Sequence, residues 1–159
     1  MAATYTAQTD DVCGVNSAYP GNSYPFCHYF NKLNTSFCLD VWGFSYDDGA
    51  GVVQYSCNSA DNQRLTKVDT DSGYFVLIFA HSGKCLEIWN WGTSDGDDVI
   101  QWACHYGDNQ QWTYDATNPY RLRNRFSGKC IAVISSGESY QAEQYTCSTS
   151  NTQKWNLWK

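Results

Sequence analysis

The stretch SGKCLEI at residues 82–88 decides the fold, because the chain restates it. A second copy, SGKCIAV, occupies residues 127–133, and a looser copy, SFCLDV, occupies residues 36–41. In each copy a turn leads into a cysteine, and the apolar residues after it alternate as they do in a strand. The repetition predicts three copies of one structural unit. The residue two places after the cysteine is not repeated: it is Asp40, Glu87 or Ala132.

Six cysteines recur with the same period. Cys38, Cys85 and Cys130 lie 47 and 45 residues apart, and each is followed by a second cysteine after 19, 19 and 17 residues. A glutamine then follows a short polar stretch in NQRL (62–65), NQQW (109–112) and TQKW (152–155). A period of this length is typical of repeat architectures, in which no unit buries its own apolar face. Three units of four short strands predict an all-β domain of roughly twelve strands.

The eight cysteines indicate a disulfide framework and an oxidising compartment. None of them form a CxxC pair, so a zinc ribbon or a thioredoxin-like site has little support. Eight cysteines allow 105 connectivities, and the repeat spacing favours the simplest one. The expected bridges are Cys38–Cys57, Cys85–Cys104 and Cys130–Cys147, with Cys13–Cys27 closing an N-terminal loop. We therefore expect a secreted protein.

Composition excludes several classes of partner. The net charge is −6 with 10 Lys and Arg residues, which disfavours nucleic acid and anionic membranes. The longest apolar run, at 74–80, has seven residues and is too short to cross a bilayer, so no membrane insertion is expected. No leader follows Met1, so we expect any secretory signal to have been removed already. Short aromatic segments separated by Gly, Asn, Asp and Ser predict an all-β fold.

The Cys-Leu-Asp-Val and Gln-x-Trp pattern, in register three times with six matching cysteines, resembles the ricin B-type β-trefoil lectins, also grouped as carbohydrate-binding module family 13. The resemblance covers residues 29–159, in repeats of about 29–70, 71–115 and 116–159, and leaves residues 1–28 as an N-terminal extension. It implies a β-trefoil with up to three shallow sugar pockets and neither metal nor cofactor. The implied partners are galactosides and lactose, with xylan or arabinogalactan as further candidates.

The resemblance also assigns roles within each pocket. In the first repeat Asp40 accepts from sugar hydroxyls, Tyr55 stacks on the sugar ring, Asn58 and Asn62 complete the hydrogen bonding, and Gln63 supports the loop. Carboxylates, amides and aromatic rings are the groups that a sugar pocket requires. The match in this repeat is good, so it is the expected binding site.

In the second repeat a glutamate replaces the aspartate. Glu87 carries one more methylene, which moves its carboxylate by roughly one C–C bond, about 1.5 Å. Two outcomes stay open: a lost pocket, or a sugar shifted outward and stacked on the aromatic ring. The further site residues that the resemblance implies here are Asn90, Trp102, His105, Asn109 and Gln110.

In the third repeat Ala132 removes the acceptor, Ser148 and Thr152 replace the flanking pair, and Tyr145 alone matches. We expect this repeat to be scaffold. Three tryptophans follow the acceptor positions of the other two repeats and are expected at the pocket rims: Trp42, Trp89 and Trp91.

Three classes of function remain. The leading hypothesis is a lectin that binds sugar without turnover, so no catalytic residue is assigned. The chain is alternatively the binding module of a larger glycoside hydrolase. A third reading is a protein-binding or protease-inhibiting trefoil that acts through the Cys13–Cys27 loop. Catalysis by paired carboxylates is disfavoured, because the acidic pairs lie in Gly- and Ser-rich loops typical of solvated turns.

Overall fold

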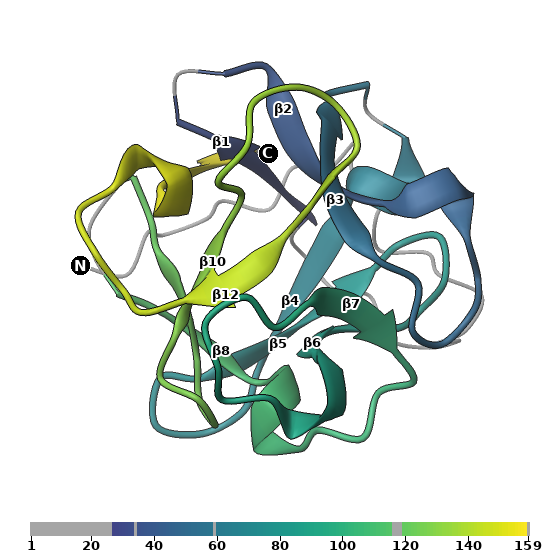
Figure 1. Ribbon diagram of the computed structural model, residues 1–159. Helices are drawn as coiled ribbons and strands as arrows, with labels where there is room; N and C mark the ends of the chain where they lie inside the picture. The colour runs from purple at the N-terminus through teal and green to yellow at the C-terminus, as the bar shows by residue number, and fades with distance from the viewer. Residues whose placement is uncertain (1–26, 34, 59, 116–118, 159) are drawn as a thin grey trace.

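A computed structural model describes residues 27–33, 35–58, 60–115 and 119–158. The described chain consists of short antiparallel strands joined by single turns of 3-10 helix (Figure 1). The strands are β1 (Cys27–Lys32), β2 (Phe37–Val41), β3 (Val52–Ser56), β4 (Leu65–Asp69), β5 (Phe75–Phe79), β6 (Cys85–Ile88), β7 (Val99–Trp102), β8 (Trp112–Tyr114), β9 (Leu122–Asn124), β10 (Cys130–Ala132), β11 (Tyr140–Gln141), β12 (Glu143–Tyr145) and β13 (Trp155–Trp158). The 3-10 turns are η2 (Trp42–Phe44), η3 (Asp61–Gln63), η4 (Trp89–Trp91), η5 (Asp108–Gln110) and η6 (Asn151–Gln153).

Two strands from each repeat form a closed barrel. β1 pairs with β13 and β4, β4 with β5, β5 with β8, and β8 with β9. The ring is completed where Tyr120 and Trp155 exchange backbone hydrogen bonds of 2.7 and 2.8 Å. Closure removes the unpaired edges that an open sheet of short strands would expose.

Each repeat adds a hairpin to the barrel: β2 with β3, β6 with β7, and β10 with β12. Equivalent residues of the three hairpins pair in a cycle, Gly51 with Ile100, Asp98 with Glu143, and β11 with β3. This arrangement confirms the predicted β-trefoil of three pseudo-symmetric repeats. The described chain has thirteen strands rather than twelve, because Ala142 interrupts the last hairpin and separates β11 from β12.

The apolar core lies inside the barrel and beneath the hairpins. Strand alternation supplies it, because residues two apart point to the same face. Leu39 and Val41 enter the core in this way, as do their counterparts in the other repeats. Trp112 and Trp155 are fully buried, and their indole nitrogens donate to backbone carbonyls of β6 and β10. Leu65 fills the corresponding position of the first repeat and is also buried.

Glutamines in the hairpins tie each repeat to the one before it. Nε2 of Gln101 donates to the carbonyl oxygens of Ser45 and Asp47, at 2.8 and 2.9 Å. Its Oε1 accepts from the hydroxyl of Ser82, the first residue of the SGKC turn. Gln144 makes the same contacts to the second repeat and to the second SGKC turn. The repeated turn therefore holds the loop of the preceding repeat.

The lysine of each SGKC turn forms a second tie of the same kind. Lys84 pairs with Asp48 at 2.7 Å, and Lys129 pairs with Asp95 at 2.8 Å. Both pairs are partly exposed, so each contributes little to stability by itself. They do, however, fix which loop lies beside which turn.

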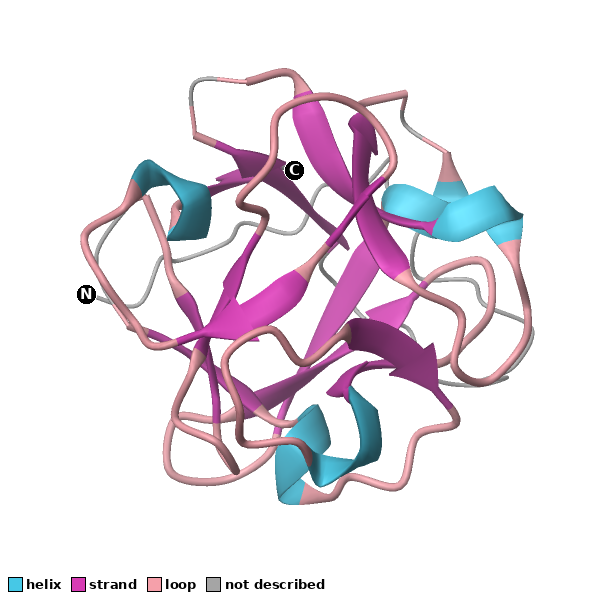
Figure 2. Cartoon of the chain, in the orientation of Figure 1, coloured by secondary structure: helices cyan, strands magenta, loops and turns pink. Residues whose placement is uncertain are grey.

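Three of the four predicted disulfides are confirmed: Cys38–Cys57, Cys85–Cys104 and Cys130–Cys147. The predicted Cys13–Cys27 bridge, and the division at residue 28, involve residues outside the described part of the chain. Among the residues described, no helix is long and apolar enough to span a membrane. Figure 2 shows the 3-10 turns gathered at three places on the rim of the molecule.

Candidate functional site

The alternation of β2 determines where Asp40 points. Leu39 and Val41 enter the core, so Asp40 between them faces the other side of the hairpin. Its side chain is nevertheless only 4% exposed, because the loop carrying η3 lies over it. A buried carboxylate without a cationic partner is costly for a fold, which makes this position a candidate site.

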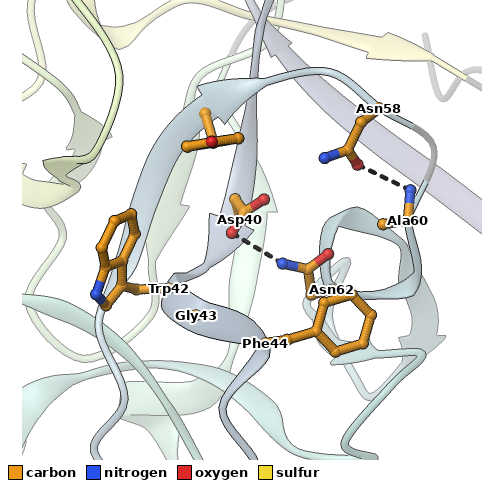
Figure 3. A pocket seen from close by; sticks show the side chains of 8 residues that line it. Asp40, Trp42, Gly43, Phe44, Asn58, Ala60 and Asn62 are labelled. Carbon is orange, nitrogen blue, oxygen red and sulfur yellow. Dashed lines mark hydrogen bonds between the residues drawn. The ribbon is translucent and has the colours of Figure 1, made fainter.

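A cavity of about 300 Å³ opens above Asp40 (Figure 3). Residues of both hairpin strands, of η2, of η3 and of the loop before η3 line it: Asp40, Trp42, Gly43, Phe44, Tyr55, Asn58, Ala60 and Asn62. Apart from Asp40, none of these lining residues carries a charge. The volume is at the small end for ligand pockets.

Both carboxylate oxygens of Asp40 accept hydrogen bonds from buried amides. Nδ2 of Asn62 donates to Oδ1 at 2.9 Å, and Nε2 of Gln63 donates to Oδ2 at 2.8 Å. Burial raises the pKa of Asp40 from its ordinary 3.8 to about 6, and the bond from Gln63 opposes part of the rise. Each oxygen keeps lone pairs that a ligand hydroxyl can use.

The flanking residues are fixed by the same network. Gln63 also donates to the carbonyl oxygen of Ser56 and accepts from the backbone N–H of Asn58, at 2.9 Å each. Asn58 accepts from the backbone of Ala60 through its side-chain oxygen. Oδ1 of Asn62 is buried and has no hydrogen-bond partner in the protein. An acceptor of this kind is expected to find a donor in water or in a ligand, and Oδ1 of Asn109 in the second repeat is unpaired in the same way.

The second repeat uses its acceptor differently. Oε2 of Glu87 accepts from Nε2 of Gln110 at 2.6 Å and contacts Nε2 of His105 at 3.2 Å. Nδ1 of His105 accepts from the backbone of Gly107, so Nε2 carries the ring proton and donates to Glu87. Trp91 stacks on the imidazole with 5.9 Å between ring centroids. Burial raises the pKa of Glu87, with the Gln110 bond and His105 opposing the rise.

The other predicted residues of the second repeat lie around this pair. Asn109 is fully buried and donates to the carbonyl oxygen of Ile88. Trp102 packs against Trp89 at 5.6 Å between centroids. Asn90 is exposed, at the left-handed centre of η4.

The third repeat retains the scaffold without the acceptor. Gln153 makes the same loop contacts as Gln63, accepting from Ser148 and donating to Thr146. Ala132 is buried and offers no polar atom. Tyr145 donates its hydroxyl to Glu143 at 2.5 Å, and this bond raises the pKa of Tyr145 to about 12. The platform residue is thus engaged within the protein.

One cluster among the described residues has the spacing of metal ligands: Asp115, Cys130 and Cys147. The two cysteines are bonded to each other, so neither offers a thiolate. Asp115 pairs with Arg121 and Arg123. This cluster is therefore an ion-paired surface beside a disulfide.

The structure adds Gly43, Phe44 and Ala60 to the pocket that the sequence predicted. Ala60 is small and gave no signal. Phe44 could have been found, because Trp-x-aromatic follows the acceptor in both WGF (42–44) and WNW (89–91). Trp42 lies at the rim, as predicted.

Two family descriptions match the chain. Ricin-type beta-trefoil lectin domain matches residues 73–159, and Ricin-type beta-trefoil lectin domain-like matches residues 25–102. No curated protein sequence matches it.

Solved structures share the fold. The designed three-fold symmetric protein ThreeFoil is 39% identical with a TM-score of 0.79, covering 82% of this chain and 96% of ThreeFoil. The exo-β-1,3-galactanase 1,3Gal43A from Clostridium thermocellum is 27% identical with a TM-score of 0.79; the match covers 82% of this chain and only 29% of that enzyme.

A third structure, the ricin B-like lectin of Macrolepiota procera in complex with lactose, is 16% identical with a TM-score of 0.70, covering 83% and 94% of the two chains. At this identity the likeness shows the fold alone. The family match spans more than half of the chain, and the structure has the three repeats and the closed barrel of a β-trefoil. The chain therefore belongs to the ricin-type β-trefoil lectin domain family, and carbohydrate binding is its general function.

Proposed function

We propose that the chain binds galactose-type glycans reversibly through the first-repeat pocket. The proposal rests on the position of Asp40. This buried carboxylate lines the cavity, and hydrogen bonds from Asn62 and Gln63 hold its two oxygens in place. Groups fixed in this way lose little entropy when a ligand arrives. Adjacent sugar hydroxyls donate to the two oxygens.

The rest of the pocket supplies orientation. The unpaired Oδ1 of Asn62 accepts a further hydroxyl, and the amide of Asn58 lies at the mouth. Tyr55 stacks against the apolar face of the ring. A single shallow site of this kind binds weakly, at roughly millimolar to tens of micromolar. Useful avidity then requires a second site, an oligomer or a tethered partner.

The choice of galactose rests on similarity. The 27% identical relative is an exo-β-1,3-galactanase, which favours galactose-containing glycans, arabinogalactan among them, over xylan. The same relative favours a second candidate role, because its matched region is 29% of a longer chain. In that role the domain is the binding module of a larger glycoside hydrolase and brings its catalytic partner to the polymer.

Neither of the other repeats is proposed as an equal site. His105 contacts Oε2 of Glu87, so a sugar hydroxyl would compete with the imidazole for this oxygen. Ala132 provides no acceptor in the third repeat. We propose that the protein is secreted, in keeping with the three disulfides of its described residues. We also propose that it has no catalytic activity of its own. The alternative protein-binding role falls on the Cys13–Cys27 loop, outside the described residues.

Calorimetric titration with galactose, lactose, xylose and xylobiose tests the proposal. We expect lactose to bind with one site per chain and Asp40→Ala to abolish binding, because losing a charged acceptor costs about 2–3 kcal/mol. The matched control is Glu87→Ala, which removes the equivalent carboxylate of the second repeat and should leave the affinity unchanged. If Asp40→Ala binds as the parent does, the assignment of the site is wrong. If xylobiose binds and lactose does not, the galactose assignment is wrong.

A further inference from the structure

Two aromatic residues at the first-repeat pocket have no role in the site as proposed. Trp42 and Phe44 flank Gly43 in η2 and are 53% and 42% exposed. Figure 3 shows them on opposite sides of Asp40. Half-exposed aromatic rings at a pocket mouth are typical of a contact surface.

The backbone at Phe44 is unusual. Its φ is 59°, in the left-handed region that a bulky residue seldom adopts. Left-handed conformations of non-glycine residues are retained where the surrounding structure holds them, and they cluster at ligand sites. Trp91 has a φ of 55° at the same place in the second repeat.

The second repeat holds Phe44 in this position. The carbonyl oxygen of Ser45 accepts from Nε2 of His81 and from Nε2 of Gln101, both at 2.8 Å. The His81 ring also packs against the edge of Phe44, with 5.1 Å between centroids. The ring of Phe44 is therefore placed before any ligand arrives.

The aromatic surface continues away from the pocket. Tyr46 packs on the same imidazole at 5.2 Å between centroids and is 63% exposed. Phe79 is buried on the His81 ring as well, at 6.1 Å. Phe44, His81 and Tyr46 thus form a continuous aromatic surface that begins at the cavity wall and leads outward.

The second repeat has only part of this surface. Trp91 packs edge-on against Phe126, which stands at the position of His81, with 5.1 Å between centroids, and it also lies over His105. The position of Tyr46 is Thr93 there, so the outer ring is missing. The third repeat has Ser136 and Glu138 at the positions of Phe44 and Tyr46. The full surface, with Tyr46 at its outer end, therefore accompanies the repeat that has an aspartate acceptor.

We infer that Phe44 and Tyr46 form a second sugar subsite, so that the first-repeat pocket recognises a disaccharide or longer glycan. The first ring is held by Asp40 and Tyr55, and the apolar face of the next ring stacks on Phe44 and Tyr46. This inference rests on the proposed function. It adds that a glycosidically linked second sugar contributes to affinity.

Paired titrations with galactose and lactose test the subsite, using the variants Phe44→Asn and Tyr46→Ala. Asparagine tolerates a left-handed backbone, so Phe44→Asn removes the ring without straining the turn. Tyr46 is mostly exposed, so its variant should fold normally. We expect each variant to weaken lactose binding by roughly threefold to tenfold, in line with other aromatic stacking contacts, and to change galactose binding by less than twofold.

The control is Trp91→Asn, which removes an aromatic ring from the same backbone position of the second repeat and should change neither affinity. An equal loss for galactose and lactose would place Phe44 in the first-ring site and overturn the subsite. Unchanged lactose binding in both variants overturns it too. In either case, binding by the parent that depends on Asp40 leaves the proposed function standing. If the parent binds neither sugar, both proposals are wrong.

Discussion

In the first repeat Asn58 turns back to its own loop, whereas in the second repeat His105 reaches across to Glu87. Both residues follow the second cysteine and accept from the backbone two residues later, Ala60 in one case and Gly107 in the other. The imidazole is longer and retains a second nitrogen, which bonds to the carboxylate. The same local turn therefore leaves Asp40 with its two amide donors alone and adds an imidazole contact to Glu87.

The supporting network does not differ in the same way. Gln63 and Gln110 each hold the backbone after the second cysteine, the carbonyl before it, and the acceptor carboxylate. The two repeats share this supporting network although their pockets differ. The network and the pocket residues can therefore vary independently. We therefore predict that a few side chains decide whether a repeat binds.

The largest expected effect follows from converting the second repeat to the first. The double variant Glu87→Asp with His105→Asn shortens the acceptor and removes the imidazole that occupies it. We expect the lactose stoichiometry to rise from one site to two per chain. Calorimetry of the double variant, with and without Asp40→Ala, measures this directly.

The combination with Asp40→Ala isolates the new site, because the first pocket is then silent. Binding that disappears altogether in the triple variant would show that shape beyond these two residues closes the second pocket. Trp91 would then be the next residue to change, since it stacks on His105.

A second prediction separates the scaffold from the pocket. Gln63→Ala removes bonds to Asp40, Ser56 and Asn58, while Gln153→Ala removes the corresponding bonds in a repeat without an acceptor. Each should lower the free energy of unfolding by about 2–3 kcal/mol, because buried partners are left unpaired. Only Gln63→Ala should also weaken lactose binding.

Denaturant unfolding and calorimetric titration of the two variants provide the comparison. Equal losses of lactose affinity in the two variants would mean that destabilisation of the whole domain weakens binding, and not a change in the orientation of the Asp40 carboxylate. Equal stability losses with unequal affinities would sharpen the division between scaffold and site.

The sequence predicted the fold because the scaffold is repeated in it. The cysteine spacing, the SGKC turns and the Gln-x-aromatic segments each have a counterpart in the structure, and all three described disulfides agree. The predicted number of strands was wrong at Ala142, which separates β11 from β12. The sequence could not show this, because β11 exists through its pairing with β3 in another repeat.

The site was less readable from sequence. The expected first-repeat residues do lie together, but their roles in binding remain predictions. The bond between His105 and Glu87 was not foreseen, since side chains 18 residues apart meet only when the hairpin and the η5 loop pack together. The aromatic surface at Phe44 was missed for a similar reason, because His81 belongs to the next repeat.

The smallest predicted effect is a dependence on pH in the first repeat. With a pKa of about 6, Asp40 loses its charge below that pH, and a protonated acid is a poor acceptor for two hydroxyls. Lactose affinity should therefore fall about tenfold between pH 7.5 and pH 5. Tyr55 is the other titratable group among the lining residues.

Thermal melting of the unliganded protein distinguishes this loss from unfolding. Because the pKa of Asp40 is higher in the folded chain than its ordinary 3.8, the folded state takes up this proton more readily. The contribution of Asp40 to the free energy of unfolding therefore rises as the pH falls from about 6 towards 4. Weaker binding at pH 5 without a lower melting temperature supports the ionised carboxylate as the acceptor, whereas constant affinity across this range would show that the sugar does not need its charge.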